Sequence, residues 1–258
     1  MKIFVISATL LELQAFYMAQ SSRIRAPRAG ETALAVHIVH TGIGVAKTMY
    51  GLLQLTQHIN PQEDILVNVG FGGCNDMELT IGDPVVVSED TFWDYGLWRN
   101  GEFISIEEVN AINFPGEKAP GYYPATTLKT LPECWAKLPR VQGYTVSHPS
   151  LGVFHWGSQH RPEPEWIETM EGAGFAMVVH QMGWNGVALR VVSNRVMQND
   201  RAQWDRAKSS KTLAESLHQG LLHYDQNYFI SQTEPCLSGT RSDGPTRPAP
   251  TTRLSLLP

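Results

Sequence analysis

The sequence lacks the features that mark secreted and membrane-spanning proteins. Its three cysteines, Cys74, Cys134 and Cys236, lie far apart and form no CxxC pair, so we expect neither a disulfide framework nor a zinc knuckle. No segment approaches the roughly 20 consecutive apolar residues that a membrane-spanning helix needs. Sparse, unpaired cysteines are typical of a reducing compartment, and we therefore expect a cytoplasmic protein.

The charge balance and the glycine pattern exclude further classes of ligand. A formal net charge of −5 and a pI of about 6.0 provide no basic face for nucleic acid or for an acidic membrane surface. The chain contains neither GxGxxG nor GxxxxGK[ST], which disfavours dinucleotides and nucleoside triphosphates. His155 and His160 have no third ligand at a suitable spacing, so no metal is expected. The expected partner is a small molecule, and no cofactor is implied.

The N-terminal residues Lys2–Leu11 resemble the short apolar core of a signal peptide, with one difference. Glu12 ends the apolar run, and the residues that follow it have a helical pattern. We therefore interpret this segment as a buried first strand that leads into a helix.

The length of the chain and the order of its apolar segments predict one α/β domain. With 258 residues, of which 42% are hydrophobic, the chain can bury one large core. Short apolar runs bounded by turn residues alternate with helical patterns, as expected for the buried strands of an α/β sheet. The predicted strands are Lys2–Ser7, Leu34–His40, Ile65–Val69, Pro84–Glu89, Leu151–His155 and Val187–Ser193.

Apolar residues recur at helical spacing in two further segments. One runs from Val45 to Ile59, after the glycine turn Thr41–Gly44, and the other runs from Leu213 to Tyr228. Both patterns predict amphipathic helices, and a third helix is predicted over Glu171–Gln181. The segment Arg99–Pro139 is rich in proline, glycine and aromatic residues, which predicts a long excursion over the mouth of a site.

The composition changes after Ile230 to serine, threonine, proline, glycine and arginine. Such a segment cannot bury enough apolar surface to fold by itself. We therefore expect a folded domain over residues 1–230 and a disordered tail over residues 231–258. The tail is either inert or an interaction arm.

Five segments, taken in order, resemble the purine nucleoside phosphorylase and nucleosidase superfamily over residues 1–229. They are Ile6–Glu12, Thr41–Gly44, Asn68–Gly73 with Ile81–Asp83, Met170–Ala173, and Ser193-Asn194. The resemblance implies a single domain with a central mixed, partly barrel-like sheet flanked by helices. It also implies an enzyme that breaks the bond between a ribose and a purine, and a homo-oligomer that is a dimer or larger.

Within that superfamily the sequence is most similar to the futalosine hydrolases, which release hypoxanthine from futalosine in menaquinone biosynthesis. Ser193–Arg195 and the continuation to Asp200–Asp205 carry this likeness, together with Ile81–Gly96. Adenine-specific nucleosidases of the superfamily have an aspartate where this chain has Asn194. The resemblance therefore implies a 6-oxopurine nucleoside as the substrate.

The chemistry of the Asn194 side chain favours the same base. When a purine departs, negative charge develops on the base and positive charge on the ribose, and the site must stabilise both. An amide can donate to a 6-oxo group while its oxygen accepts from a protonated ring nitrogen, but it cannot protonate adenine. Taken alone, Asn194 is also explained as a residue that caps the end of a strand.

The resemblance assigns two residues of the Met170–Ala173 segment to the ribose. The Glu171 carboxylate would bind the ribose hydroxyls, and Met170 would lie against the apolar face of the sugar. Each residue has a structural alternative, because Glu171 also suits the dipole at a helix N-terminus and Met170 also suits a core position.

Glu12 distinguishes a hydrolase from a phosphorylase. The resemblance makes it the residue that orients the attacking water. Phosphorylases of the superfamily supply glycine and arginine near the first strand to hold phosphate, whereas Ala8–Glu12 offers a carboxylate that would repel it. A carboxylate there suits a water that attacks the anomeric carbon. Arg190 would support that water or the Glu171 carboxylate, or would form a structural ion pair.

Four other positions are expected to contact the substrate. By the resemblance, Phe71 and Gly72 belong to the ligand loop and Ser193 to the base-binding segment. Phe154 follows a predicted strand and would stack on the purine, although an aromatic residue there also fits a core position.

Three functions remain open from the sequence. The first is a futalosine-type hydrolase with Glu12, Glu171 and Asn194 as its catalytic residues. The second is a nucleosidase or phosphorylase that acts on inosine, guanosine, methylthioadenosine or adenosylhomocysteine. The third is a nucleoside-binding protein without turnover, which the two acids beside a neutral ribose argue against. Release of a free base, and its dependence on phosphate, separates the three.

Overall fold

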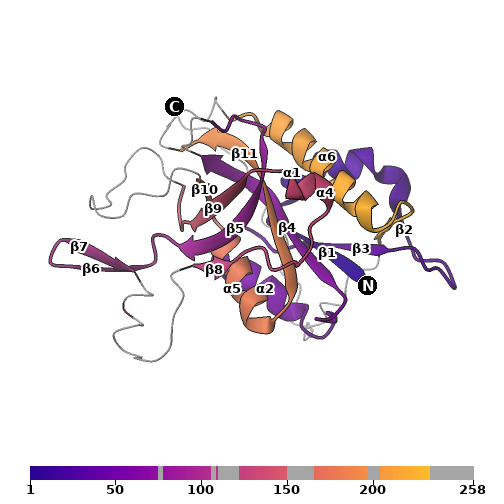
Figure 1. Cartoon of the computed structure of the whole chain (residues 1–258), viewed down its shortest axis with the longest axis horizontal. Helices are drawn as coiled ribbons and strands as arrows, with labels where there is room; N and C mark the ends of the chain where they lie inside the picture. The colour runs from indigo at the N-terminus through magenta and orange to yellow at the C-terminus, as the bar shows by residue number, and fades with distance from the viewer. Residues whose placement is uncertain (75–77, 106–108, 110–121, 150–165, 197–203, 233–258) are drawn as a thin grey trace, which may run out of the picture.

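The apolar runs of the sequence pair into one large mixed sheet, which the computed structural model shows at the centre of the molecule (Figure 1). The structure describes residues 1–74, 78–105, 109, 122–149, 166–196 and 204–232. The strands of this sheet are β1 (Lys2–Ser7), β2 (Ile24–Arg25), β3 (Ala35–His40), β4 (Ile65–Cys74), β5 (Pro84–Phe92), β8 (Tyr123–Pro124), β9 (Arg140–Thr145), β10 (Trp166–Thr169), β11 (Asn185–Arg195) and β12 (Phe229–Ser231). A separate hairpin is formed by β6 (Gly96–Arg99) and β7 (Glu102–Ser105).

Five strands of the large sheet close into a ring. β4 pairs with β11, β11 with β5, β5 with β9, β9 with β10, and β10 pairs again with β4. The β11–β5 and β10–β4 pairs are antiparallel and the other three pairs are parallel. β1, β3, β12 and β2 extend the ring beyond β4 as parallel strands. This mixed, partly barrel-like sheet confirms the expected fold class.

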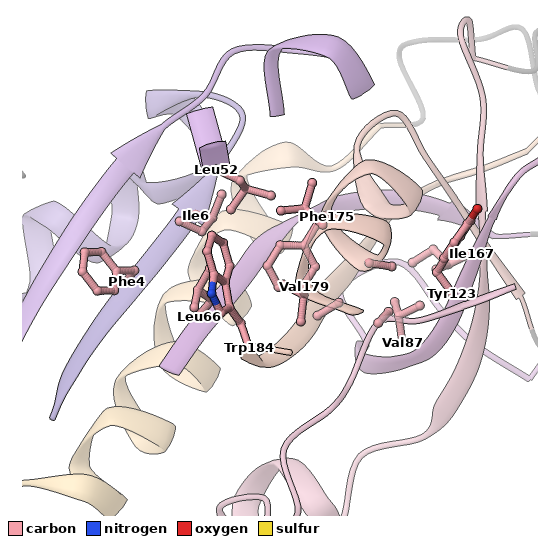
Figure 2. Close-up of a cluster of buried hydrophobic side chains, with 14 of the residues drawn as sticks. Phe4, Ile6, Leu52, Leu66, Val87, Tyr123, Ile167, Phe175, Val179 and Trp184 are labelled. Atoms are coloured by element: carbon pink, nitrogen blue, oxygen red, sulfur yellow. The ribbon is translucent and has the colours of Figure 1, made fainter. Parts of the chain in front are cut away.

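Helices cover both faces of the sheet, so its central strands are buried on both sides. Phe4 and Ile6 of β1 pack in one apolar cluster with residues of α2 and α5, several of which Figure 2 shows. Ile3 and Val5, which alternate with them along the strand, pack in a second cluster with residues of α1, α4 and α6. The helices are α1 (Leu10–Ala19), α2 (Val45–Gln54), α4 (Glu133–Ala136), α5 (Gly172–Met182) and α6 (Arg206–Tyr224), and a 3-10 turn, η1, spans Ser21–Arg23.

Most of the predicted strands have counterparts in the structure. The runs that begin at Lys2, Leu34, Ile65, Pro84 and Val187 correspond to β1, β3, β4, β5 and β11. The predicted strand Leu151–His155 lies outside the described residues. β9 and β10, which complete the ring, were not predicted from the sequence.

Two expectations about the C-terminal part of the chain need comment. The helical pattern was extended to Tyr228, but α6 ends at Tyr224 because the next residue, Asp225, adopts an extended conformation. Tyr228 instead lies just before β12, with its ring buried. Ser231, the first residue of the predicted tail, belongs to β12, and residues 233–258 lie outside the described part of the chain.

The predicted excursion over residues 99–139 is partly wrong. The described residues near its end belong to the core, since β8 pairs with β5 and the Trp135 ring of α4 is buried. The Trp135 indole Nε1 donates to the Ser216 carbonyl oxygen of α6 at 2.9 Å. Among the helices of the described residues, none is long and apolar enough to cross a membrane.

Candidate active site

Two of the predicted catalytic residues, Glu12 and Glu171, lie near Arg190 of β11, and Glu12 and Arg190 both lie beside Gly70 of β4, just beyond the carboxyl end of β1. Gly70 of β4 lies between two of the side chains. A Cβ atom at Gly70 would lie 2.7 Å from Glu12 Oε1 and 4.0 Å from Arg190 Nε. The absence of a side chain at Gly70 therefore allows both groups to approach the backbone of β4.

Glu12 is fixed by hydrogen bonds at the start of α1. Its Oε2 atom accepts from the Thr9 backbone N–H at 2.8 Å, the Ser7 hydroxyl at 2.9 Å and the Thr9 hydroxyl at 3.1 Å. The bond from the N-cap backbone is half of a capping box, so helix formation itself orients this side chain. The other oxygen, Oε1, lies beside Gly70 and 3.4 Å from the Phe71 backbone nitrogen.

Glu171 is held where α5 begins and the loop before α2 approaches it. Its Oε1 atom accepts a hydrogen bond of 2.8 Å from the Gly44 backbone N–H. Gly44 has φ of +96°, a conformation that favours glycine, so the predicted turn Thr41–Gly44 provides this donor. Burial raises the pKa of the Glu171 carboxyl, and the nearby Glu12 charge adds to that rise, while the Gly44 N–H and Arg190 oppose it.

Arg190 is buried, with 2% of its surface exposed, and its hydrogen bonds go to neutral oxygens. Nη1 donates to the Asn68 and Leu189 carbonyl oxygens at 2.9 and 3.0 Å, and Nη2 donates to the Asn68 side-chain oxygen. Burial lowers the pKa of the guanidinium, and the charges of Glu171, Asp90 and Glu12 raise it. Arg190 therefore acts on three carboxyl groups through space while Asn68 fixes its position.

Ser193 and Asn194 lie at a bulge in β11, where the register against β4 shifts between Val192 and Asn194. A bulge changes the direction of side chains, and it brings the Asn194 amide beside Gly73, where an added Cβ would lie 2.9 Å from Nδ2. The Ser193 hydroxyl donates to Asn194 Oδ1 at 2.8 Å, and Asn194 Nδ2 donates to the Arg195 carbonyl oxygen at 3.2 Å. Asn194 is half-buried, and Ser193 fixes the orientation of its amide.

The remaining predicted positions are distributed differently. Met170 is half-buried immediately before Glu171, and the Gly72 backbone packs against Ile167 of β10. The Phe71 side chain packs against the cluster of α1 and α6, so only its backbone N–H lies beside Glu12. Phe154 lies outside the described residues.

A fourth charged residue of this cluster, Asp90 of β5, was not predicted from the sequence. It is 1% exposed, and burial raises the pKa of its carboxyl to about 7, against the opposing effects of a Thr145 hydrogen bond and the Arg190 charge. In the sequence Asp90 stands among the polar residues Ser88, Glu89 and Thr91, and that pattern reveals neither its burial nor its neighbours. Within the described residues, no group of histidines, cysteines and acids is arranged to hold a metal ion.

Comparison with solved structures identifies the fold. The methylthioadenosine/adenosylhomocysteine nucleosidase of S. pneumoniae, solved with a transition-state inhibitor, superimposes with a TM-score of 0.63 at 20% identity, covering 87% of this chain and 100% of that one. Futalosine hydrolase of Helicobacter pylori gives a TM-score of 0.62 at 16% identity, covering 86% and 97%. S-adenosylhomocysteine nucleosidase of Streptococcus pyogenes gives 0.60 at 19% identity, covering 87% and 97%.

These similarities show that the chain has the fold of the nucleoside phosphorylase and nucleosidase superfamily. No protein-family model matches the sequence, and no curated protein matches it either.

Proposed function

We propose that this protein hydrolyses the N-glycosidic bond of a purine nucleoside, and that its substrate is futalosine, which it converts to hypoxanthine and dehypoxanthine futalosine. The observation that carries this proposal is the convergence of Glu12 and Glu171 on one buried guanidinium. Each carboxyl acts on the Arg190 charge, and Glu12 raises the pKa of Glu171, so the two acids share one electrostatic environment. Two acids in one cluster suit a reaction whose transition state is a ribose cation.

The two carboxylates have different roles. Glu12 Oε2 is occupied by three hydrogen bonds, which leaves Oε1 to accept from a water molecule beside Gly70. In this role Glu12 orients the water and takes its proton as the anomeric carbon is attacked. Glu171 accepts from the ribose hydroxyls, and that contact strengthens as positive charge develops on the sugar.

The surroundings of Arg190 favour water over phosphate as the nucleophile. A phosphorylase must hold a phosphate dianion with free cationic donors. Here the Arg190 donors that the structure describes are directed at Asn68 and Leu189, and the guanidinium is buried. Glu12 and Glu171 would also repel an anion at this position.

The amide at position 194 favours a 6-oxopurine such as hypoxanthine. Ser193 donates to Asn194 Oδ1, which fixes the two ends of the amide and leaves a hydrogen of Nδ2 to donate to the 6-oxo group. A mismatched 6-amino group would leave buried donors unpaired, at a cost of about 1–3 kcal/mol for each group.

Methylthioadenosine or adenosylhomocysteine is the second candidate substrate. The nucleosidase of S. pneumoniae is as similar in structure to this chain as the futalosine hydrolase of Helicobacter pylori, with TM-scores of 0.63 and 0.62. Similarity of fold therefore does not distinguish these substrates, and the Asn194 side chain is what favours futalosine.

We also propose that the protein is a homo-oligomer. Large apolar side chains are exposed at the start of α1, just before α2 and along α2; they are Leu10, Leu11, Ile43, Tyr50 and Leu53. Clusters of large exposed apolar side chains are typical of surfaces that contact another subunit. Sedimentation of the full chain should give a dimer or larger species, and a monomer at micromolar concentration would contradict the proposal.

The test is a substrate panel measured by chromatography of the released base. Purified protein is incubated separately with futalosine, inosine and methylthioadenosine in phosphate-free buffer, together with Glu12→Gln and the control Glu215→Gln, whose carboxylate is exposed on α6. Wild type and Glu215→Gln should release hypoxanthine from futalosine, and Glu12→Gln should bind futalosine but not cleave it. Preference for methylthioadenosine would support the second candidate, and no release of base from any substrate would refute both.

A further inference from the structure

Asp90 has no role in the reaction described so far, yet the structure makes specific room for its carboxyl group. It lies between β9 and the first turn of α5. A Cβ atom at either Gly143 or Gly172 would overlap Asp90 Oδ2. Glycine at both positions is therefore what allows a buried carboxyl to approach the two backbones.

Asp90 is connected to α5 through a hydroxyl. The Thr145 hydroxyl donates to Asp90 Oδ1 at 2.8 Å and accepts from the Ala173 backbone N–H at 2.7 Å. Because a hydroxyl has one proton, the donation to Asp90 leaves the oxygen lone pairs of Thr145 to accept from the helix. Thr169 contacts the Thr145 hydroxyl at 3.2 Å and accepts from the Gly172 N–H at 3.1 Å.

These bonds satisfy backbone groups that have no partner within the helix. The first N–H groups of any α-helix need acceptors from outside it. Glu171 is the N-cap residue of α5, but its side chain bonds to Gly44 and makes no capping bond of its own. The capping function falls to Thr145 and Thr169, and Asp90 fixes the Thr145 hydroxyl.

We propose that Asp90 is a positioning residue for the reaction, which holds the first turn of α5, and with it the Glu171 carboxylate, through the Thr145 hydroxyl. This inference rests on the proposed hydrolase function, in which Glu171 must meet the ribose. A shift of about 1 Å in such a group is enough to reduce a rate by up to about a hundredfold.

The charge of Asp90 makes this positioning depend on pH. The pKa of its carboxyl is raised to about 7, mainly by burial; the Glu171 charge at the start of α5 contributes to this rise, and the Thr145 hydrogen bond and Arg190 of β11 oppose it. A hydroxyl bonds more strongly to a carboxylate than to a neutral acid. The link to α5 is therefore strongest above neutral pH.

The first test replaces the connecting hydroxyl and leaves Asp90 in place. Thr145→Val removes it, Thr145→Ser retains it, and Thr126→Val is the matched control because the Thr126 hydroxyl bonds to the Val87 carbonyl oxygen of β5 rather than to α5. We expect a fall in kcat of about tenfold or more for Thr145→Val, near wild-type kcat for Thr145→Ser and for Thr126→Val, and little change in KM. Equal rates for Thr145→Val and Thr126→Val would overturn the inference.

The second test follows the pH dependence. Between pH 6 and pH 8 the kcat of wild type should rise as Asp90 ionises, and in Asp90→Asn most of that rise should be absent while a folded spectrum is retained. A variant whose pH profile matches wild type would contradict the role given to Asp90. If Asp90→Asn does not fold, the Thr145 pair and the exchange measurement below decide the question.

Amide hydrogen exchange without substrate separates this inference from the proposed function. In Thr145→Val the Ala173 amide should exchange at least about tenfold faster than in wild type, while amides in the middle of α5 should be unchanged. Unchanged exchange at Ala173 would overturn the inference even in an active enzyme. Faster exchange would support the structural link even if wild type released no base, an outcome that would refute the hydrolase proposal alone.

Discussion

Replacing Asp90 by asparagine should remove a loss of stability that the wild-type protein shows as the pH rises. In the folded protein burial raises the pKa of this carboxyl from 3.8 to about 7. The unfolded chain releases the proton near pH 4, whereas the folded chain keeps it until about pH 7. Folding therefore takes up a proton between these values, and the free energy of unfolding falls as the pH rises through that range.

The magnitude follows from the shift. A difference of about three pKa units corresponds to about 4 kcal/mol at 1.36 kcal/mol per unit, and about 3 kcal/mol of this is lost between pH 5 and pH 8. The asparagine side chain of the variant does not titrate. The free energy of unfolding of Asp90→Asn minus that of wild type should therefore be about 3 kcal/mol larger at pH 8 than at pH 5. The kcat of the variant should fall. Substitutions near catalytic sites commonly raise stability and lower activity in this way.

Urea unfolding of both proteins at pH 5, 6, 7 and 8 measures this difference. Glu171 is present in both chains, so the comparison isolates Asp90, and Glu215→Gln controls for the loss of one carboxylate from the exposed face of α6. A stability difference between wild type and Asp90→Asn that is constant across the four pH values, or that shifts in favour of wild type as the pH rises, would refute the reasoning.

Three other substitutions test separate parts of the account. Gly70→Ala places a Cβ 2.7 Å from Glu12 Oε1, so kcat should fall at least tenfold with the fold retained; unchanged kinetics would contradict the placement of Glu12. Asn194→Asp should raise the rate with methylthioadenosine relative to futalosine, and an unchanged ratio would show that this side chain does not contact the base. Trp135→Ala should lower the free energy of unfolding by about 3–5 kcal/mol, measured by denaturant, because its buried ring fills the space beneath Gly220 of α6; a loss below about 1 kcal/mol would contradict that packing.

The parts of the fold that were predicted from the sequence are those where burial alone determines the pattern. β1, β3 and β11 are recognisable in the sequence as apolar runs, because helices cover both faces of the sheet in which they lie. β9 and β10 were missed because they are short and carry polar residues such as Gln142 and Glu168. Four-residue α4 is too short to show a helical period, which is why buried Trp135 was assigned to an excursion.

The candidate site was predicted only in part, for a related reason. Glu12 and Glu171 lie where helices begin, and Asn194 lies at the second-last position of β11, and such ends of elements carry recognisable sequence motifs. Asp90 lies within a strand, and its contacts come from Thr145 and the backbone of Gly172, more than 50 residues away. Periodicity describes one element at a time, so it cannot show which elements meet around a buried charge.

The central claim is that water, oriented by Glu12, displaces a 6-oxopurine from its ribose. Its most direct test is the rate of hypoxanthine release from futalosine by the wild-type protein, measured first without phosphate and then with millimolar phosphate. We predict release without phosphate at a rate that added phosphate leaves unchanged. Release that requires phosphate would contradict the claim, as would the absence of any release from futalosine while another nucleoside is cleaved.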